Sequence, residues 1–139
     1  MEEEIGYLLK KVQHALHLRL NKELAEHSLT MAQFGALRTL EEIPNASNAD
    51  LARGSFVTPQ TMIKILQGLE HAGYVTRQPH PYNKRVITTQ LTLAGAEKLA
   101  AGEELVRRIE AQMVLGLTIE EQHAFRLMLS SCYVALEQQ

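Results

Sequence analysis

Residues 47–91 read SNADLARGSFVTPQTMIKILQGLEHAGYVTRQPHPYNKRVITTQL. The pattern predicts a short helix, a tight turn, a second helix and then a two-stranded ribbon with a basic tip. This order of elements is typical of a winged helix-turn-helix, in which one helix enters a groove of DNA and the ribbon lies beside it.

The positive charge of the chain is concentrated in the same stretch. Over 139 residues, 14 Lys and Arg stand against 16 Asp and Glu, for a net charge of −2. Residues 51–90 carry five basic and one acidic side chain, whereas residues 1–50 carry five and eight and residues 91–139 carry four and seven. The positive charge therefore lies where a phosphate backbone would lie, between two acidic flanks.

Length and composition predict one globular domain in the cytoplasm. An apolar content of 45% is typical of a folded core, and no apolar run approaches the about 20 residues that a membrane span needs. The N-terminal MEEEIGYLLKK lacks the basic start of a secretory signal. The single cysteine, Cys132, excludes an intrachain disulfide framework and suits a reducing compartment.

Periodicity and capping signals predict six helices. Their approximate ranges are 3–26, 31–42, 47–53, 59–72, 92–115 and 119–136, with strands over 74–78 and 86–91. Capping boxes are predicted at Thr30 and Thr118, and Ser47, with Asp50 three residues later, is expected to cap the third helix. Thr58 is expected to cap the fourth helix, with Pro59 in its first turn, and Gly54 and Gly73 to end the third and fourth.

The outer helices carry more apolar surface than a small winged domain needs. The first has a stripe that includes Ile5, Val12 and Leu20, and the last has Phe125, Met128, Leu129, Cys132 and Leu136 on one face. A homodimer would bury these faces, so we expect one.

Three segments together resemble the MarR family of bacterial transcription regulators. They are LTMAQFGALRTL (29–40), NADLARGSFVTPQTMIKILQGLEHAGYVTR (48–77) and NKRVITTQLTLAGAEKL (83–99). The resemblance implies a mainly α fold with a small β-wing. Residues 30–92 would form the winged helix-turn-helix lobe, and 1–28 and 93–139 the dimerisation helices. The chain departs from the family pattern at the wing tip, where Asn83 stands in place of the usual Asp and supplies no ion pair to Arg85.

The DNA-reading side of the fourth helix should lie opposite its apolar face. The side chains expected there are Gln60, Thr61, Ile63, Lys64 and Gln67. A glutamine amide can read adenine, the methyl groups of threonine and isoleucine suit the methyl group of thymine, and lysine can bind guanine or phosphate. The alternative interpretation is a solvated polar helix face.

Phosphate and minor-groove contacts are expected on both sides of this helix. Lys84 and Arg85 at the wing tip and Arg77 at its base would contact the backbone or the minor groove, unless the ribbon is only a basic surface hairpin. Ser55 and Thr58 could donate hydrogen bonds to phosphate.

Three further residues invite other hypotheses. His14 and His17 lie on one side of the first helix, and through the resemblance they would line a crevice that binds a small lipophilic or phenolic ligand. As a metal site the pair is weak, and no metal or cofactor is expected. Cys132 could support a redox response, but no basic residue within four positions lowers its pKa, which favours a packed core cysteine.

The function predicted from these features is a homodimeric regulator that binds a pseudo-palindromic operator in double-stranded DNA. The resemblance further implies a repressor that a small molecule releases. Two alternatives remain: a ligand-binding or interaction protein of the same fold without operator binding, and a redox-responsive regulator that uses Cys132. An enzyme is not expected, because the sequence contains no phosphate loop, nucleophile elbow or spaced metal ligands.

Overall fold

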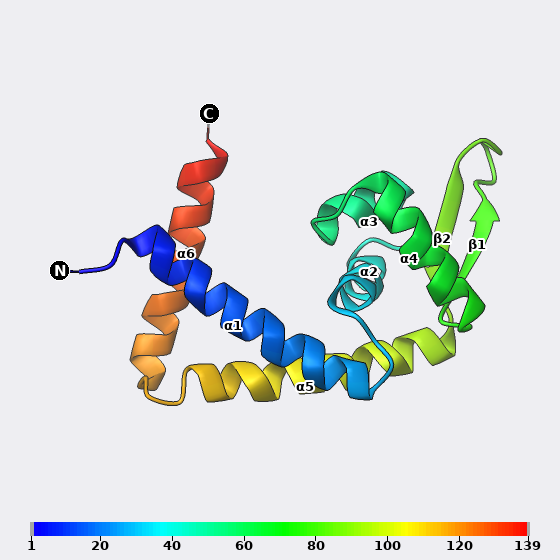
Figure 1. Ribbon diagram of the computed structural model, residues 1–139. Helices are drawn as coiled ribbons and strands as arrows, with labels where there is room; N and C mark the ends of the chain where they lie inside the picture. The colour runs from blue at the N-terminus through cyan, green and yellow to red at the C-terminus, as the bar shows by residue number, and fades with distance from the viewer. Residues whose placement is uncertain (1, 139) are drawn as a thin grey trace. The chain divides into compact units, whose positions relative to one another are not determined.

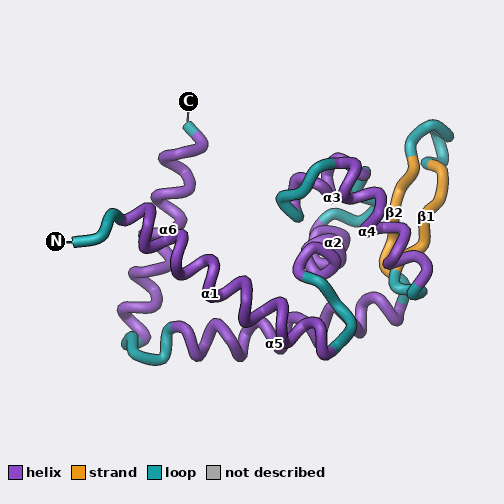
Figure 2. The backbone as a smooth tube through the Cα atoms, viewed as in Figure 1, coloured by secondary structure: helices purple, strands orange, loops and turns teal. Residues whose placement is uncertain are grey.

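A computed structural model of the chain describes residues 2–138, which contain six helices and one two-stranded sheet (Figure 1). The elements in chain order are α1 (Ile5–Glu26), α2 (Met31–Glu42), α3 (Asn48–Gly54), α4 (Pro59–His71), β1 (Val75–Pro79), β2 (Ile87–Leu91), α5 (Leu93–Met113) and α6 (Ile119–Glu137). This order confirms the predicted mainly α fold with a small β-wing, which Figure 2 shows as a single ribbon among helices.

Two compact units divide the described chain, one up to Val106 and one from Arg107 onward. The first holds α1 to α4, the ribbon and most of α5, and the second holds the end of α5 and all of α6. No described helix is both long and apolar enough to cross a membrane.

Capping boxes are present at the starts of three helices, including the two predicted at Thr30 and Thr118. At α2, the Thr30 hydroxyl accepts a hydrogen bond from the Gln33 amide at 3.0 Å, and the Gln33 side chain accepts one from the Thr30 amide at 3.0 Å. The same reciprocal pair joins Ser47 to Asp50 at α3 and Thr118 to Glu121 at α6. Each box satisfies two backbone donors that the helix itself leaves free.

The core of the first unit lies where α2, α3 and α4 meet. Its fully buried side chains include Leu37 from α2, Leu51 from α3, and Met62 and Leu66 from α4. Leu24 adds a buried side chain from α1, as Leu99 does from α5. The predicted apolar face of α4 is therefore confirmed as the face that the lobe buries, which fixes the opposite face toward solvent.

The antiparallel ribbon continues directly from the end of α4. Gly73, at a φ of +83°, ends the helix as predicted, and Val75 then pairs with Leu91 at the base of the ribbon. At the same place the Thr92 hydroxyl donates a hydrogen bond of 2.7 Å to the carbonyl oxygen of Gly73. The end of α4, the base of the wing and the start of α5 are thus tied together within a few residues.

Gly54 ends α3, as the sequence predicts, although not in a left-handed conformation. It is the last residue of α3, and a Cβ there would clash with the Thr39 hydroxyl on α2. The left-handed residue is Phe56, two positions later. Glycine is needed at position 54 because α2 and α3 approach closely, not because the backbone turns there.

The second unit has far less interior. Every residue of α6 is described and none is buried, although the helix carries a run of large apolar side chains. Cys132 is exposed, so within the single chain it is not the packed core cysteine that the sequence favoured. The reason is that Cys132 lies on the apolar face of α6, and the single chain does not bury that face.

Candidate nucleic-acid interface

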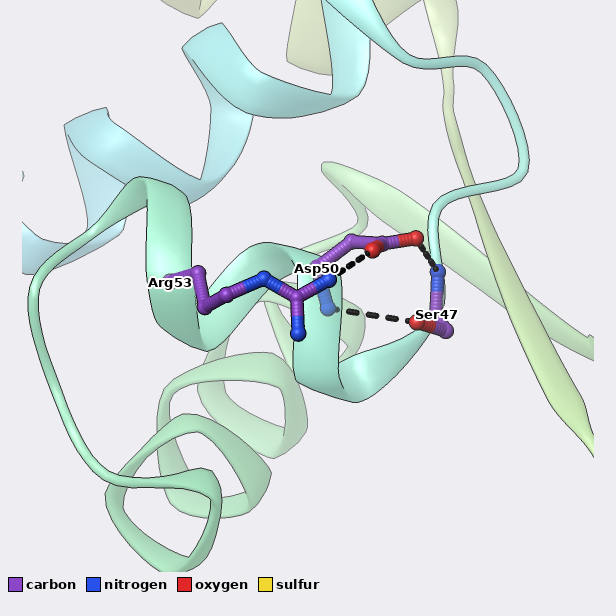
Figure 3. Close-up of polar contacts among 3 residues, drawn as sticks. All are labelled: Ser47, Asp50 and Arg53. Carbon is purple, nitrogen blue, oxygen red and sulfur yellow. Dashed lines mark hydrogen bonds and ion pairs between the residues drawn. The ribbon is translucent and has the colours of Figure 1, made fainter. Parts of the chain in front are cut away.

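The short helix α3 is held at its start by a network of three polar side chains (Figure 3). The Asp50 carboxylate accepts a hydrogen bond from the Ser47 amide at 3.2 Å and forms an ion pair with Arg53. The hydrogen bonds from Ser47, together with the charge of Arg53, hold the pKa of Asp50 below its ordinary value of 3.8. Asn48 extends the network, because its side-chain amide donates to the carbonyl oxygen of Pro59 in α4 at 3.2 Å.

The recognition helix candidate, α4, begins with the cap that its sequence predicts. The Thr58 hydroxyl accepts a hydrogen bond from the Thr61 amide at 3.1 Å, and Pro59 occupies the first turn. The Thr58 hydroxyl also donates to the Thr61 hydroxyl oxygen at 2.9 Å. Thr58 therefore uses its donor within the cap, and the hydroxyl proton left to point outward belongs to Thr61.

The outer face of α4 is as the sequence placed it. The five side chains expected to face DNA are all exposed or partly exposed: Gln60, Thr61, Ile63, Lys64 and Gln67. Ile63 is 41% exposed, so much of its apolar surface meets solvent. The face thus combines an amide, a hydroxyl, an ammonium and an apolar group, which complement the contacts that base edges and phosphates offer.

The expectation for Ser55 needs correction. Its hydroxyl oxygen is buried, and it has no hydrogen-bond partner within residues 2–138. A Cβ on Gly35 of α2 would lie 3.2 Å from this oxygen, so the Ser55 side chain points into the α2–α3 contact. A hydroxyl in that place does not donate to a phosphate on the surface.

The basic residues of the wing lie where the sequence predicts, and those at its tip are more exposed than the one at its base. Lys84 and Arg85 are exposed in the turn between the strands. Arg77 is half-buried on β1, with its Nε buried. Asn83 accepts a hydrogen bond from the Arg85 amide at 3.2 Å. The asparagine therefore orders the backbone of the turn, and in this structure it does so without an ion pair.

The two histidines of α1 have different surroundings. His14 lines a hollow of about 360 Å³ together with Tyr7, Lys10, Lys11 and Gln13. His17 instead lies 3.0 Å from the side-chain amide of Asn21, measured from its Nε2. Among the described residues, no three His, Cys, Asp or Glu side chains gather in a way that could hold a metal ion.

Comparison with known proteins settles the family. The sequence profile of the MarR family matches residues 29–87. The chain is 36% identical over 125 residues to the HTH-type transcriptional repressor Rv2887 of Mycobacterium tuberculosis, an alignment that covers 90% of each protein. The chain belongs to the MarR family.

Solved structures of MarR proteins have the same fold. The crystal structure of the Mycobacterium tuberculosis MarR family protein Rv2887 in complex with DNA aligns with a TM-score of 0.81 and 34% identity, covering 94% of this chain and 98% of that one. A second crystal structure of Rv2887 contains p-aminosalicylic acid and aligns with a TM-score of 0.79. The apo form of wild-type MarR from E. coli matches at a TM-score of 0.83 and 24% identity, which supports the fold alone.

Two exposed aromatic residues of this MarR protein were missed by the sequence reasoning. Tyr82 at the wing tip is 95% exposed, and Phe56 in the turn between α3 and α4 is 91% exposed. Tyr82 stands directly before Asn83 in the connector between the two strands, where the sequence predicts DNA contacts only for Lys84 and Arg85. Phe56 gave no signal, because its exposure depends on the conformation of the turn between α3 and α4.

Proposed function

We propose that this MarR-family protein is a homodimeric, sequence-specific DNA-binding repressor. The observation that carries the proposal is the exposed face of α4, where Gln60, Thr61 and Lys64 project from a helix held by a buried apolar face. Lys84 and Arg85 extend the same basic surface at the wing. The relative Rv2887 is named a transcriptional repressor and has been solved with DNA, which supports the same role here.

The dimer in this proposal would be formed by the outer helices. Residues 1–28 and 93–139 carry apolar side chains that the single chain leaves exposed, among them Leu9 and Val12 of α1 and Leu136 of α6. A twofold axis through such an interface presents two α4 helices to two half-sites about one helical turn, or about 10 bp, apart.

The effector in this proposal is a small aromatic carboxylic acid. The relative Rv2887 has been solved with salicylic acid and with p-aminosalicylic acid. The hollow on α1 offers one compatible surface, because Lys10 and His14 can meet a carboxylate and Tyr7 a ring, while Lys11 is paired with Glu3. Binding of the acid would favour a lobe spacing that does not fit the operator, so acid and DNA weaken each other by the same factor.

The DNA-binding part is tested by the salt dependence of duplex binding. A duplex selected from a random pool by the wild-type protein should lose affinity steeply as salt rises. Lys64→Ala and Arg85→Ala should each weaken binding and lower the salt slope by about one for each phosphate that is no longer bound. Lys22→Ala removes the same charge from α1 and serves as the matched control, with little expected change. Absence of duplex binding by the wild type at low salt would overturn the proposal.

The effector part is tested by adding salicylate to the complex of protein and duplex. Fluorescence anisotropy should report release of DNA, whereas phenol and cyclohexanecarboxylate, which lack the carboxylate and the aromatic ring respectively, should release much less. His14→Gln should weaken the response more than His17→Gln, because only His14 lines the hollow. Equal release by all three compounds would contradict a site for aromatic acids.

A further inference from the structure

The turn between α3 and α4 places a bulky residue in a backbone conformation that favours glycine. Phe56 has a φ of +56°. The Val57 amide donates to the carbonyl oxygen of Ala52 at 3.0 Å, and the Phe56 amide donates to that of Arg53 at 3.3 Å. These two bonds define a Schellman ending of α3, with Phe56 at the left-handed position where glycine is preferred.

Two other helices of the chain end with the same pair of bonds. At the end of α4 the left-handed residue is Gly73, with a φ of +83°, and at the end of α1 it is Ser28, with a φ of +59°. Both are small residues, as the strain of this conformation demands. Of these three endings, only the one before α4 carries a large side chain.

Within residues 2–138, the Phe56 ring is too exposed for packing to offset this strain. It is 91% exposed, whereas the hydroxyl of the preceding residue, Ser55, is buried. Strain held at an exposed residue is typical of functional sites, where a partner supplies the missing contact.

The surroundings of the ring point to the nature of that partner. Phe56 stands two residues before Thr58, which caps α4, and three residues after Arg53, whose side chain is 74% exposed. The exposed Gln60 and Lys64 follow on α4 itself. An apolar ring that is close in sequence to an exposed arginine and to the start of α4 suits a nucleic acid, which offers sugar faces and thymine methyl groups beside its phosphates.

We propose that the Phe56 ring packs against the apolar surface of the DNA, either a deoxyribose or a thymine methyl group, beside the groove that α4 enters. The proposal rests on the DNA-binding function proposed above and adds an apolar contact to its polar ones. Such a contact releases no counterions, so it contributes to affinity without contributing to the salt slope.

The test compares Phe56→Gly with the wild type on the selected duplex. Affinity should fall about tenfold, equivalent to about 1.4 kcal/mol, while the salt slope stays the same. The melting temperature of the free protein should stay the same or rise, because glycine relieves the left-handed strain. Phe56→Tyr, which keeps the ring, should restore most of the affinity.

Ser28→Gly is the matched control, since it makes the same relief of strain at the end of α1. Its melting temperature should rise or stay the same, and its affinity for DNA should not change. Unchanged affinity in Phe56→Gly would overturn the proposal while leaving the DNA-binding function intact, provided that Lys64→Ala still weakens binding. A lower salt slope together with a lower melting temperature would overturn it too, because the ring would then act by holding α4 in place. Loss of the dimer in Phe56→Gly would assign the ring to a protein contact instead.

Substitution of deoxyuridine for thymidine, one position at a time, separates the two DNA surfaces. If the ring meets a thymine methyl group, one substitution weakens the wild type and leaves Phe56→Gly unaffected. If the ring meets a sugar, every substituted duplex keeps the full difference between the two proteins.

Discussion

The winged lobe buries its apolar side chains, whereas α6 leaves its apolar side chains exposed. In the lobe, α4 places Met62, Leu66 and Leu69 in a closed core and turns its polar side outward. In α6 no residue is buried, and Leu136 is 81% exposed. The lobe therefore has a buried core, whereas α6 presents an apolar surface that a dimer would bury.

The residues expected to read DNA are therefore different from the residues that stabilise the DNA-binding lobe. A polar side chain on the exposed face of α4 can be changed without loss of stability, because the buried opposite face holds the helix in place. An exposed apolar side chain on α6, such as Leu136, contributes little to the stability of the single chain. Variants that change one region alone test whether the stability of the lobe depends on α6.

The largest expected effect comes from the core of the lobe. Leu66→Ala should lower the free energy of unfolding by about 2–5 kcal/mol, because the side chain is fully buried and leaves a cavity. Leu136→Ala on α6 removes the same atoms from an exposed position and should cost about 0.5 kcal/mol or less at protein concentrations where the chain is monomeric. Urea denaturation measures both. Equal losses would mean that α6 is as well packed as the lobe.

A charged pair on α6 should break the dimer without unfolding the lobe. Met128→Glu with Leu136→Glu places two carboxylates on the apolar face, which an interface cannot desolvate. Sedimentation should show monomers, the helical signal should persist, and DNA affinity should fall at least about tenfold because the two half-sites are no longer bound together. Ser130→Glu lies away from this face and should leave the dimer intact. A dimer that survives the double variant would contradict the assignment of α6.

Removal of the helix caps should cost about 1 kcal/mol each. Thr58→Ala removes the bond to the Thr61 amide at the start of α4, and Thr118→Ala removes the corresponding bond to Glu121 at the start of α6. Hydrogen exchange should show faster opening of the first turn in each helix. Only Thr58→Ala should also weaken DNA binding, because only α4 presents its start to DNA. A matching loss in Thr118→Ala would show that the two regions are not independent.

The smallest expected effect is on the stability of the protein at acidic pH. The pKa of Asp50 is lowered from 3.8 by its bonds to Ser47 and the charge of Arg53, so the ionised carboxylate stabilises the folded state. That contribution is present above pH 3.8 and is lost as the pH falls below it, through the lower pKa of the folded state. Asp50→Asn should flatten the pH dependence of stability in this range. An unchanged acid profile would show that the Ser47–Asp50 box is not formed in solution.

The local parts of this structure could be predicted from the sequence. Capping boxes and the left-handed Gly73 depend on residues only a few positions apart, so the sequence contains all the interacting groups. The exposed side of α4 also followed from periodicity, because one apolar face leaves only one polar face.

The parts that failed depend on contacts between elements. The Ser55 hydroxyl is buried because Gly35 on α2 leaves room for it, and the close approach of Thr39 on the same helix requires glycine at position 54. The left-handed residue of this turn is Phe56. The exposure of Cys132 could not be predicted either, since it depends on what covers α6 rather than on the stripe itself.

The central claim is that two lobes, joined through their outer helices, read two half-sites at once. It is tested most directly by measuring affinity for duplexes in which the two selected half-sites are moved apart in steps of one base pair. The account predicts one dimer per duplex, strongest binding at a centre-to-centre spacing of about 10 bp and a minimum about 5 bp further, where the half-sites face opposite sides of the helix. Affinity that does not depend on spacing, or binding of one chain per half-site, would contradict it.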